Sequence, residues 1–332
     1  MIKGKKLDRD ILKMAAIAIL IFVIMVYNNG KFLRPANITS MCYQLPELGL
    51  YSLAMMMAML TGGIDLSVVA IGNLSAICAV KVMQIAVANG YSGISTFGMV
   101  VLGIVVALLV GGIFGLFNGY VIANLNLAPM LATMATSIFI KGISIIITEG
   151  QSVSGAPAEF IWFGAHTLLG IPFSMWILII VIAVTAFMLH RTRFGFEAKM
   201  VGSNPKASHF TSINIKKVYM KAYLYSGIVS ALCGVIILMK TDTAKADYAF
   251  TYVMQAILCC VLGSTNPNGG TAKISCMVFS LLSLQFLSSG FNMMRLSSYF
   301  KEFTWGLLLI VVLSINFISA YVRQRRGQHR GR

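Results

Sequence analysis

The chain has 332 residues, of which 58% are apolar and only 11% are charged, and its mean hydropathy is +0.83. Soluble globular proteins carry about 25% charged residues, so a water-soluble domain of this length is excluded. The net charge of +16 comes from Lys and Arg residues scattered between long apolar stretches, which favours a role in membrane topology over nucleic-acid binding.

The apolar stretches predict an all-α polytopic membrane protein, because a helix needs about 20 apolar residues to cross a bilayer. No small-residue cleavage site follows the first stretch, so we expect a retained helix rather than a secretory signal. The ten predicted spans are residues 11–27, 45–61, 66–88, 98–123, 128–148, 173–189, 222–239, 250–263, 272–290 and 303–322.

Lys and Arg residues are divided unevenly between the two sides that ten spans define. The side with both termini and the loop 190–221 holds eighteen of them, whereas the opposite side holds six. Basic loop residues stay in the cytoplasm, so the termini and this loop are predicted to be cytoplasmic. We expect residues 1–322 to form one transmembrane domain and residues 323–332 to form a basic cytoplasmic tail that binds anionic membrane lipid.

The connection 149–173 faces the opposite side and carries neither Lys nor Arg. Its Gly155, Pro157, Trp162 and Pro172 favour a short interfacial or re-entrant segment over a disordered linker. Such a segment would shape the outer mouth of a pathway.

Sequence patterns of several enzyme classes are missing. The chain has no phosphate-binding loop with its lysine and no zinc-protease motif, its six cysteines form no paired motif, and its four His residues are dispersed. We therefore expect no catalytic residue, no metal site and no cofactor in this chain. Glu47 and Asp65 are predicted to lie near span ends, with no acid deep within a span. Ion-driven carriers place ionisable groups near the bilayer midplane, so the energy for any active transport is expected from elsewhere.

Two turn motifs interrupt the apolar pattern on the predicted cytoplasmic side. In TGGIDLS, residues 61–67, Gly62 and Gly63 permit a tight turn or a close backbone approach. Asp65 can cap the following helix or line a cytoplasmic gate where interrupted helices meet. VLGSTNPNGG, residues 261–270, repeats this layout in the second half of the chain, which hints at an internal repeat. Its candidate gate residues are Gly263, Thr265, Gly269 and Gly270.

The cytoplasmic loop contains a helix start. Asn204 followed by Pro205 places an amide N-cap before a proline at the first helical position, and residues 206–212 are expected to form about two helical turns. Lys199, Lys206, Lys216 and Lys217 flank this segment. It suits the docking of a soluble partner, or it is a solvated loop that sets topology; a loop of some thirty residues without a role is uncommon.

Small and polar residues within the spans suggest packing seams and a pathway. Gly111, Gly115 and Gly119 form a smooth ridge that lets two helices pack closely, within this chain or at a dimer seam. Polar groups inside the spans either line the pathway or bond between helices. The pathway candidates are Asn73, Asn118, Thr133, Thr136 and Gln255, with Gln84 and Gln285 beside them.

Four stretches together resemble the permease subunits of ribose-type ATP-binding-cassette importers. They are TGGIDLS at 61–67, Asn118-Gly119 with PMLATMATSIFIKG at 129–142, the loop segment 194–219, and VLGSTNPNGG at 261–270. The resemblance runs from about residue 45 to residue 322. It implies a type II-like importer architecture in a bacterial cytoplasmic (inner) membrane.

The resemblance also implies a function and partners. The cargo would be a small neutral sugar, polyol or nucleoside, delivered by an extracytoplasmic substrate-binding protein. A second permease subunit, identical or different, would complete the pathway, and ATP would be bound by a partner ATP-binding subunit. The segment that couples to this subunit would comprise Gly202, Asn204, Pro205, Lys206, Ala207 and His209. Two alternatives stay open: a secondary carrier or facilitator that needs no ATPase, and a membrane scaffold or receptor without a pathway.

Overall fold

The computed structural model describes residues 9–90 and 93–330, and almost all of its regular structure is helical. The helices are α1 (Arg9–Asn28), α2 (Pro35–Leu60), α3 (Val68–Ala88), α4 (Ile94–Leu125), α5 (Pro129–Thr148), α6 (Ala158–Ala165), α7 (Phe173–Arg191), α8 (Arg193–Ser203), α9 (Pro205–His209), α10 (Ile215–Thr241), α11 (Thr251–Leu262), α12 (Ile274–Met293) and α13 (Ser298–Arg330). Two antiparallel pairs of short strands complete it: β1 (Val153–Ser154) with β4 (Thr243–Ala244), and β2 (Thr167–Leu168) with β3 (Ile171–Pro172).

Eight helices in the described part of the chain are long and apolar enough to cross a membrane. The other two expected spans correspond to α2 and α11. Helix α2 begins at Pro35, ten residues before the predicted start, and α11 has only 12 residues, or about 18 Å of helix. A polytopic helical membrane protein is therefore confirmed, with one half-length helix among its long ones.

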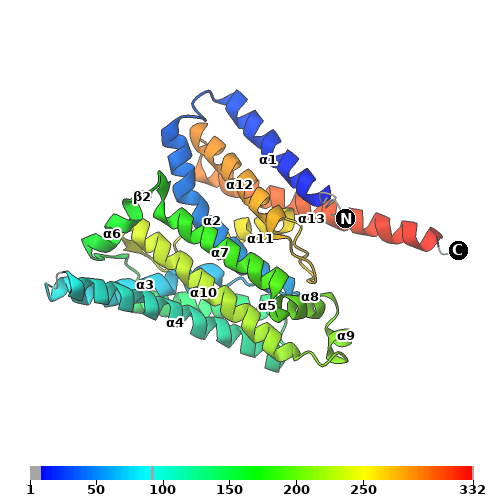
Figure 1. Cartoon of the computed structure of the whole chain (residues 1–332), viewed down its shortest axis with the longest axis horizontal. Helices are drawn as coiled ribbons and strands as arrows, with labels where there is room; N and C mark the ends of the chain where they lie inside the picture. Colours follow the sequence, from blue (N-terminus) through cyan, green and yellow to red (C-terminus); the bar gives the residue numbers. More distant parts are fainter. Residues whose placement is uncertain (1–8, 91–92, 331–332) are drawn as a thin grey trace, which may run out of the picture.

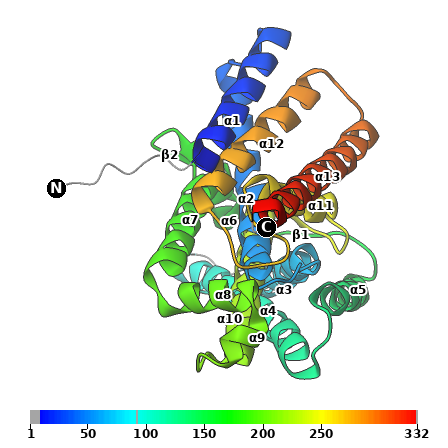
Figure 2. The same cartoon turned by 90° about the vertical axis from the view of Figure 1, so that its right-hand side faces the viewer.

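Helix α10 packs against α2, α3 and α4 (Figures 1 and 2). The predicted glycine ridge on α4 faces α10. A Cβ at Gly115 would lie 2.5 Å from the carbonyl oxygen of Tyr223, and one at Gly119 would lie 2.8 Å from the Cα of Met220. The ridge therefore serves packing within this chain, where small residues let helices approach closely in lipid.

The bundle has two ends, named here after the short helices that they carry. The α9 end holds the turns 61–67, 126–128 and 263–273 together with α8 and α9, and the α6 end holds the connections 29–34, 149–172 and 242–250. At the α6 end the short helix α6 packs on α10, and β1 ties the connection 149–172 to the segment after α10. The segment 149–173 thus contains a short ordered helix and is not an unstructured linker; its interfacial or re-entrant position stays a prediction.

Helix α13 continues without a break to Arg330, and its last turns project away from the bundle (Figure 1). The sequence predicts a basic tail at residues 323–332, after the span 303–322. Residues 331 and 332 lie outside the described residues, but up to Arg330 the tail continues the helix of the span.

Candidate functional site

Four glycines from three separate segments meet at the α9 end, and we call this contact the glycine junction: Gly62, Gly202, Gly269 and Gly270. The backbone N–H of Gly270 donates to the carbonyl of Leu60 at 3.0 Å. A Cβ at Gly269 would lie 2.6 Å from the carbonyl oxygen of Gly202 and 2.8 Å from the nitrogen of Gly62. The two predicted turn motifs therefore contact each other and the end of α8 directly through their backbones.

Positive backbone angles explain why glycine is needed here. Gly62 has φ +88° and Gly269 has φ +92°, a region that residues with a Cβ rarely adopt. Gly263 and Thr265 belong to the same turn but lie outside the junction. A Cβ at Gly263 would lie 2.6 Å from the Cα of Met277, so this glycine serves the packing of α11 against α12.

Asp65 is fully buried beside the junction and anchors a second group of residues, the Asp65 cluster: Asp65, Ser67, Asn118 and Ser226. Its Oδ1 accepts from the N–H of Ser67 at 3.0 Å and from the Ser67 hydroxyl at 2.5 Å. Its Oδ2 accepts from the Ser226 hydroxyl at 2.7 Å, and Asn118 Nδ2 donates to Ser67 Oγ at 2.8 Å. The cluster thus joins the turn after α2 to α4 and α10.

The predicted capping role of Asp65 is wrong. Helix α3 begins at Val68, its N-cap is Ser67, and no side-chain cap bond is formed, because the Asp65 carboxylate is engaged two residues along in a local turn and across the bundle with α10. Burial raises the pKa of the Asp65 carboxyl, and the hydrogen bonds from Ser67 and Ser226 oppose that rise.

Thr133 on α5 lies against the same turn. Its Oγ1 accepts from the N–H of Leu66 at 3.1 Å and lies 3.0 Å from the carbonyl oxygen of Ile64. The Tyr223 hydroxyl and Asn118 Oδ1, both buried nearby, have no hydrogen-bond partner in the described part of the chain. Because an unpaired buried polar group is costly, two such atoms beside one carboxylate mark this interface as a functional candidate.

Helices α8 and α9 carry the predicted coupling segment. Asn204 caps α9 as predicted, since its Oδ1 accepts from the N–H of Ala207 at 3.0 Å. The helix is shorter than the expected two turns: it ends at His209, Phe210 keeps right-handed helical backbone angles as its C-cap, and the chain reaches φ +57° at Ser212. Asn204, Pro205, Lys206, Ala207 and His209 are exposed, whereas Gly202 is buried in the glycine junction.

A groove of about 590 Å³ runs along this segment. The link between α4 and α5 forms one wall, and α9 with the start of α10 forms the other. Phe210 stands at its edge with 88% of its surface exposed. The lining residues include Ile122, Asn126, Pro129, Lys206, His209, Phe210 and Tyr219. The exposed part of the α9 end thus combines a capped helix, basic side chains and an apolar groove.

The pathway candidates do not gather in one place. Asn118 and Thr133 lie at the Asp65 turn, whereas Asn73 bonds to the carbonyls of Ala246 and Tyr248 at 3.3 and 2.9 Å, towards the α6 end. The other candidates are scattered: Thr136 bonds back to Ala132 within α5, Gln255 is half-buried on α11, Gln84 donates to the carbonyl of Ser154, and Gln285 contacts Gln44 at 3.5 Å.

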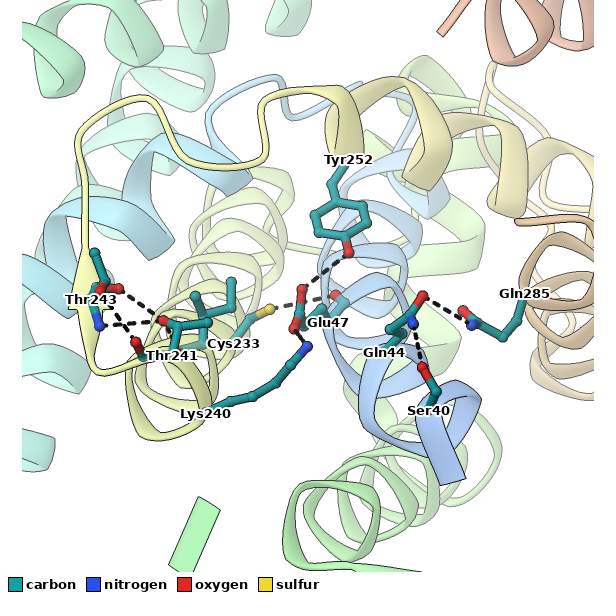
Figure 3. Close-up of polar contacts among 10 residues, drawn as sticks. Ser40, Gln44, Glu47, Cys233, Lys240, Thr241, Thr243, Tyr252 and Gln285 are labelled. Atoms are coloured by element: carbon teal, nitrogen blue, oxygen red, sulfur yellow. Dashed lines mark hydrogen bonds and ion pairs between the residues drawn. The ribbon is translucent and has the colours of Figure 1, made fainter. Parts of the chain in front are cut away.

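A polar group that the sequence analysis missed lies in the half of the bundle towards the α6 end, and we call it the Glu47 cluster: Glu47, Lys240, Tyr252 and Cys233 (Figure 3). Glu47 lies 12 residues after the start of α2 and is buried, so the expectation that no acid lies deep within a span is wrong. Its carboxylate pairs with Lys240 from α10 and accepts from the Tyr252 hydroxyl of α11 at 3.0 Å. The Cys233 thiol donates to the Glu47 carbonyl oxygen at 3.4 Å.

The sequence signal that could have revealed this cluster is the regular spacing of polar residues along α10. Tyr223, Ser226, Ser230, Cys233 and Lys240 recur at intervals that place them on one helix face, and this face meets both clusters. Among the described residues, no group of three or more His, Cys, Asp or Glu side chains could hold a metal ion.

Comparisons with known proteins agree with this architecture. The family described as branched-chain amino acid transport system / permease component matches residues 37–313. The ribose import permease protein of Bacillus subtilis (strain 168) is 29% identical over 90% of this chain and 89% of its own length. The D-allose transport system permease protein of Escherichia coli (strain K12) is 27% identical over 90% and 89%. The autoinducer 2 import system permease protein of Escherichia coli (strain K12 / DH10B) is 28% identical over 94% and 88%. No solved structure matches the chain.

Proposed function

Because this multi-pass membrane chain belongs to the permease components of ribose-type ATP-binding-cassette importers, we propose that it moves a small neutral sugar, or a related polyol or nucleoside, across a bacterial inner membrane. Its relatives import ribose, D-allose and autoinducer 2, all small polar molecules. Amide and hydroxyl groups suit such cargo better than fixed charges, which supports Asn73, Asn118, Thr133, Thr136 and Gln255 as contacts along the pathway.

The proposed topology has ten membrane crossings, with α2 and α11 counted among them and both termini in the cytoplasm. The distribution of Lys and Arg supports this orientation and makes the α9 end cytoplasmic. Residues 1–322 form the transmembrane domain, residues 190–221 its coupling loop, and the continuation of α13 a basic tail at the lipid surface.

One observation carries the mechanism: the end of α8 touches both turn motifs in the glycine junction. A partner ATP-binding subunit would grip Asn204, Pro205, Lys206, Ala207 and His209 and push on α9 when it closes around ATP. Gly202 would pass that push to Gly62 and Gly269 by direct backbone contact. The neighbouring Asp65 cluster, which ties the same turn to α4 and α10, would then act as the cytoplasmic gate.

Reconstitution tests whether this chain provides the pathway while a separate subunit binds and hydrolyses ATP. The chain would be placed in proteoliposomes with its ATP-binding subunit, a second permease subunit and an extracytoplasmic substrate-binding protein, and uptake of labelled sugar measured. We expect uptake only with ATP and all components, and no ATP hydrolysis by the purified chain alone. Uptake by the chain alone, driven by an ion gradient, would instead identify a secondary carrier.

Cross-linking tests the coupling segment and the orientation together. A cysteine in Lys206→Cys or His209→Cys is expected to form a cross-link with the ATP-binding subunit in intact membranes. Tyr27→Cys provides the matched control, because Tyr27 is 92% exposed but lies at the end of α1 that faces the α6 end. Equal cross-linking from both ends would contradict the proposed topology.

A further inference from the structure

Three helices converge on one carboxylate in the half of the bundle towards the α6 end. The Glu47 side chain on α2 is 2% exposed, whereas that of its partner Lys240 on α10 is 26% exposed. Tyr252 of α11 donates to the second carboxylate oxygen at 3.0 Å. Figure 3 shows both groups reaching the carboxylate from opposite sides. Glu47 is therefore fully partnered, and its pair reaches the surface only through Lys240.

A buried charge pair in this position contributes little net stability to helix packing. Taking two charges out of water costs about as much as their attraction returns, so apolar side chains of similar volume hold helices together at least as well. The pair differs from apolar contacts in one respect. When the two charges separate and water can enter, both are hydrated again. Such a contact has two acceptable states, closed and paired or open and hydrated.

Helix α10 connects this pair to the coupling segment. The same helix bonds to Asp65 through Ser226 and to Glu47 through Lys240. These positions are 14 residues apart, or about 21 Å along a helix. Only residues 210–214 separate α9 from α10, and Pro46, beside Glu47, interrupts the hydrogen-bond ladder of α2 where a helix bends most readily. Movement at α9 would therefore tilt α10 and pull Lys240 away from Glu47.

We propose that the Glu47–Lys240 pair, backed by Tyr252, is the extracytoplasmic gate of the permease, which must part and re-form in each transport cycle. This inference rests on the proposed function. It assigns these three residues a role in closing the pathway, distinct from binding the cargo or the ATP-binding subunit.

Cys233 is a built-in reporter of the gate. It lies seven residues before Lys240 on α10, is fully buried, and bonds to the Glu47 carbonyl oxygen. A membrane-impermeant maleimide added from the extracytoplasmic side would reach Cys233 only if the gate opened. Peptide mass spectrometry distinguishes this labelling from that of the other cysteines, so no further substitution is needed.

The single variants Glu47→Gln and Lys240→Met each remove one charge of the pair and leave the other without its counter-charge. We expect the rate of Cys233 labelling to rise about tenfold in resting membranes, since removal of one partner strongly destabilises a buried pair. Lys245→Met is the matched control: it breaks the Lys245–Asp247 pair, 3.1 Å long and 49% exposed on both sides, in the segment after α10. This control should label and transport like the wild type.

The double variant Glu47→Gln/Lys240→Met leaves no unpaired charge, so we expect it to fold and to shield Cys233 from labelling as the wild type does. We also expect slow transport, because the open state is no longer stabilised by hydration of two charges. Wild-type labelling in both folded single variants, or wild-type uptake in the double variant, would overturn the gate. The labelling needs only this chain in a membrane. Unchanged labelling with intact ATP-driven uptake therefore rejects the gate alone, whereas uptake without the ATP-binding subunit rejects the proposed function.

Discussion

The two ends of the bundle are held together by different chemistry. At the α9 end, Gly62, Gly202 and Gly269 place three backbones in direct contact. Towards the α6 end, Glu47 and Lys240 reach across between helices. A backbone contact at van der Waals distance has no second arrangement nearby, whereas a charge pair can exchange its partner for water. The glycine junction is therefore built to move as one body, and the Glu47–Lys240 pair to separate.

The largest expected effect comes from adding one methyl group to the glycine junction. Gly269→Ala puts a Cβ 2.6 Å from the Gly202 carbonyl oxygen at a backbone angle of φ +92°. The unfavourable backbone angle costs about 1–2 kcal/mol, and the clash adds about 1–3 kcal/mol. We expect a large loss of folded protein, measured as the thermal unfolding midpoint of the purified chain.

Gly170→Ala separates strain from crowding. Gly170 also has a positive angle, φ +78°, but nothing lies within 4 Å of its Cβ position. This variant should lose only the backbone cost of about 1–2 kcal/mol. Equal losses in the two variants would show that the glycine junction is not tightly packed and does not move as one rigid body.

A smaller effect is expected from Asp65→Asn, which keeps the shape of the side chain but removes its charge. The amide keeps only one oxygen acceptor, so it can accept from Ser67, whose bonds end on Oδ1, or from Ser226, whose bond ends on Oδ2, but not from both. Bonds to a charged group contribute about 1.5–3 kcal/mol each, so a loss of that size is expected in the free energy of unfolding.

Ser226→Ala supplies the other arm of a double-mutant cycle with Asp65→Asn. Because the two side chains bond directly, their effects should be less than additive by more than about 0.5 kcal/mol. Strict additivity would mean that the turn and α10 are not energetically coupled through Asp65, and α10 would lose its tie to the α9 end.

Features that depend on neighbouring residues were predictable from the sequence. The N-cap at Asn204 and the turns at Gly62 and Gly269 follow from local backbone chemistry. The ten apolar stretches follow from composition, apart from the start of α2 at Pro35. Its first turns are polar and read as a loop, yet Asn37 bonds to Ser289 of α12, and no local signal reveals such a partner.

Contacts between distant segments were not predictable, because no local sequence signal reveals a distant partner. Gly202 gives no sign in the sequence that it meets Gly269, because both glycines look like ordinary turn residues. The apolar pattern begins at residue 45 and therefore predicts Glu47 near a span end, whereas α2 begins at Pro35. The pairing of Glu47 with Lys240, a residue counted only for topology, depends on how α2 and α10 cross.

The smallest expected effect concerns the N-cap of α9. It tests whether α9 transmits movement from the ATP-binding subunit to the glycine junction. Asn204→Ala removes a cap bond to Ala207 that contributes about 1 kcal/mol, so amide exchange in α9 should quicken about fivefold. The unfolding midpoint should stay unchanged, because α9 has only five residues and is mostly exposed. ATP-driven uptake should fall, since a frayed α9 absorbs the push instead of passing it to the glycine junction.

Asn214→Ala is the matched control, because Asn214 makes an equivalent cap bond to Lys217 at 3.0 Å. It caps α10, whose 27 residues are largely buried, so packing keeps that helix in place and uptake should stay near wild type. Asn204→Asp restores the cap acceptor and should restore uptake. If both alanine variants reduced uptake equally, the loss of a cap anywhere in the loop would matter, and α9 would have no special part in coupling the two ends.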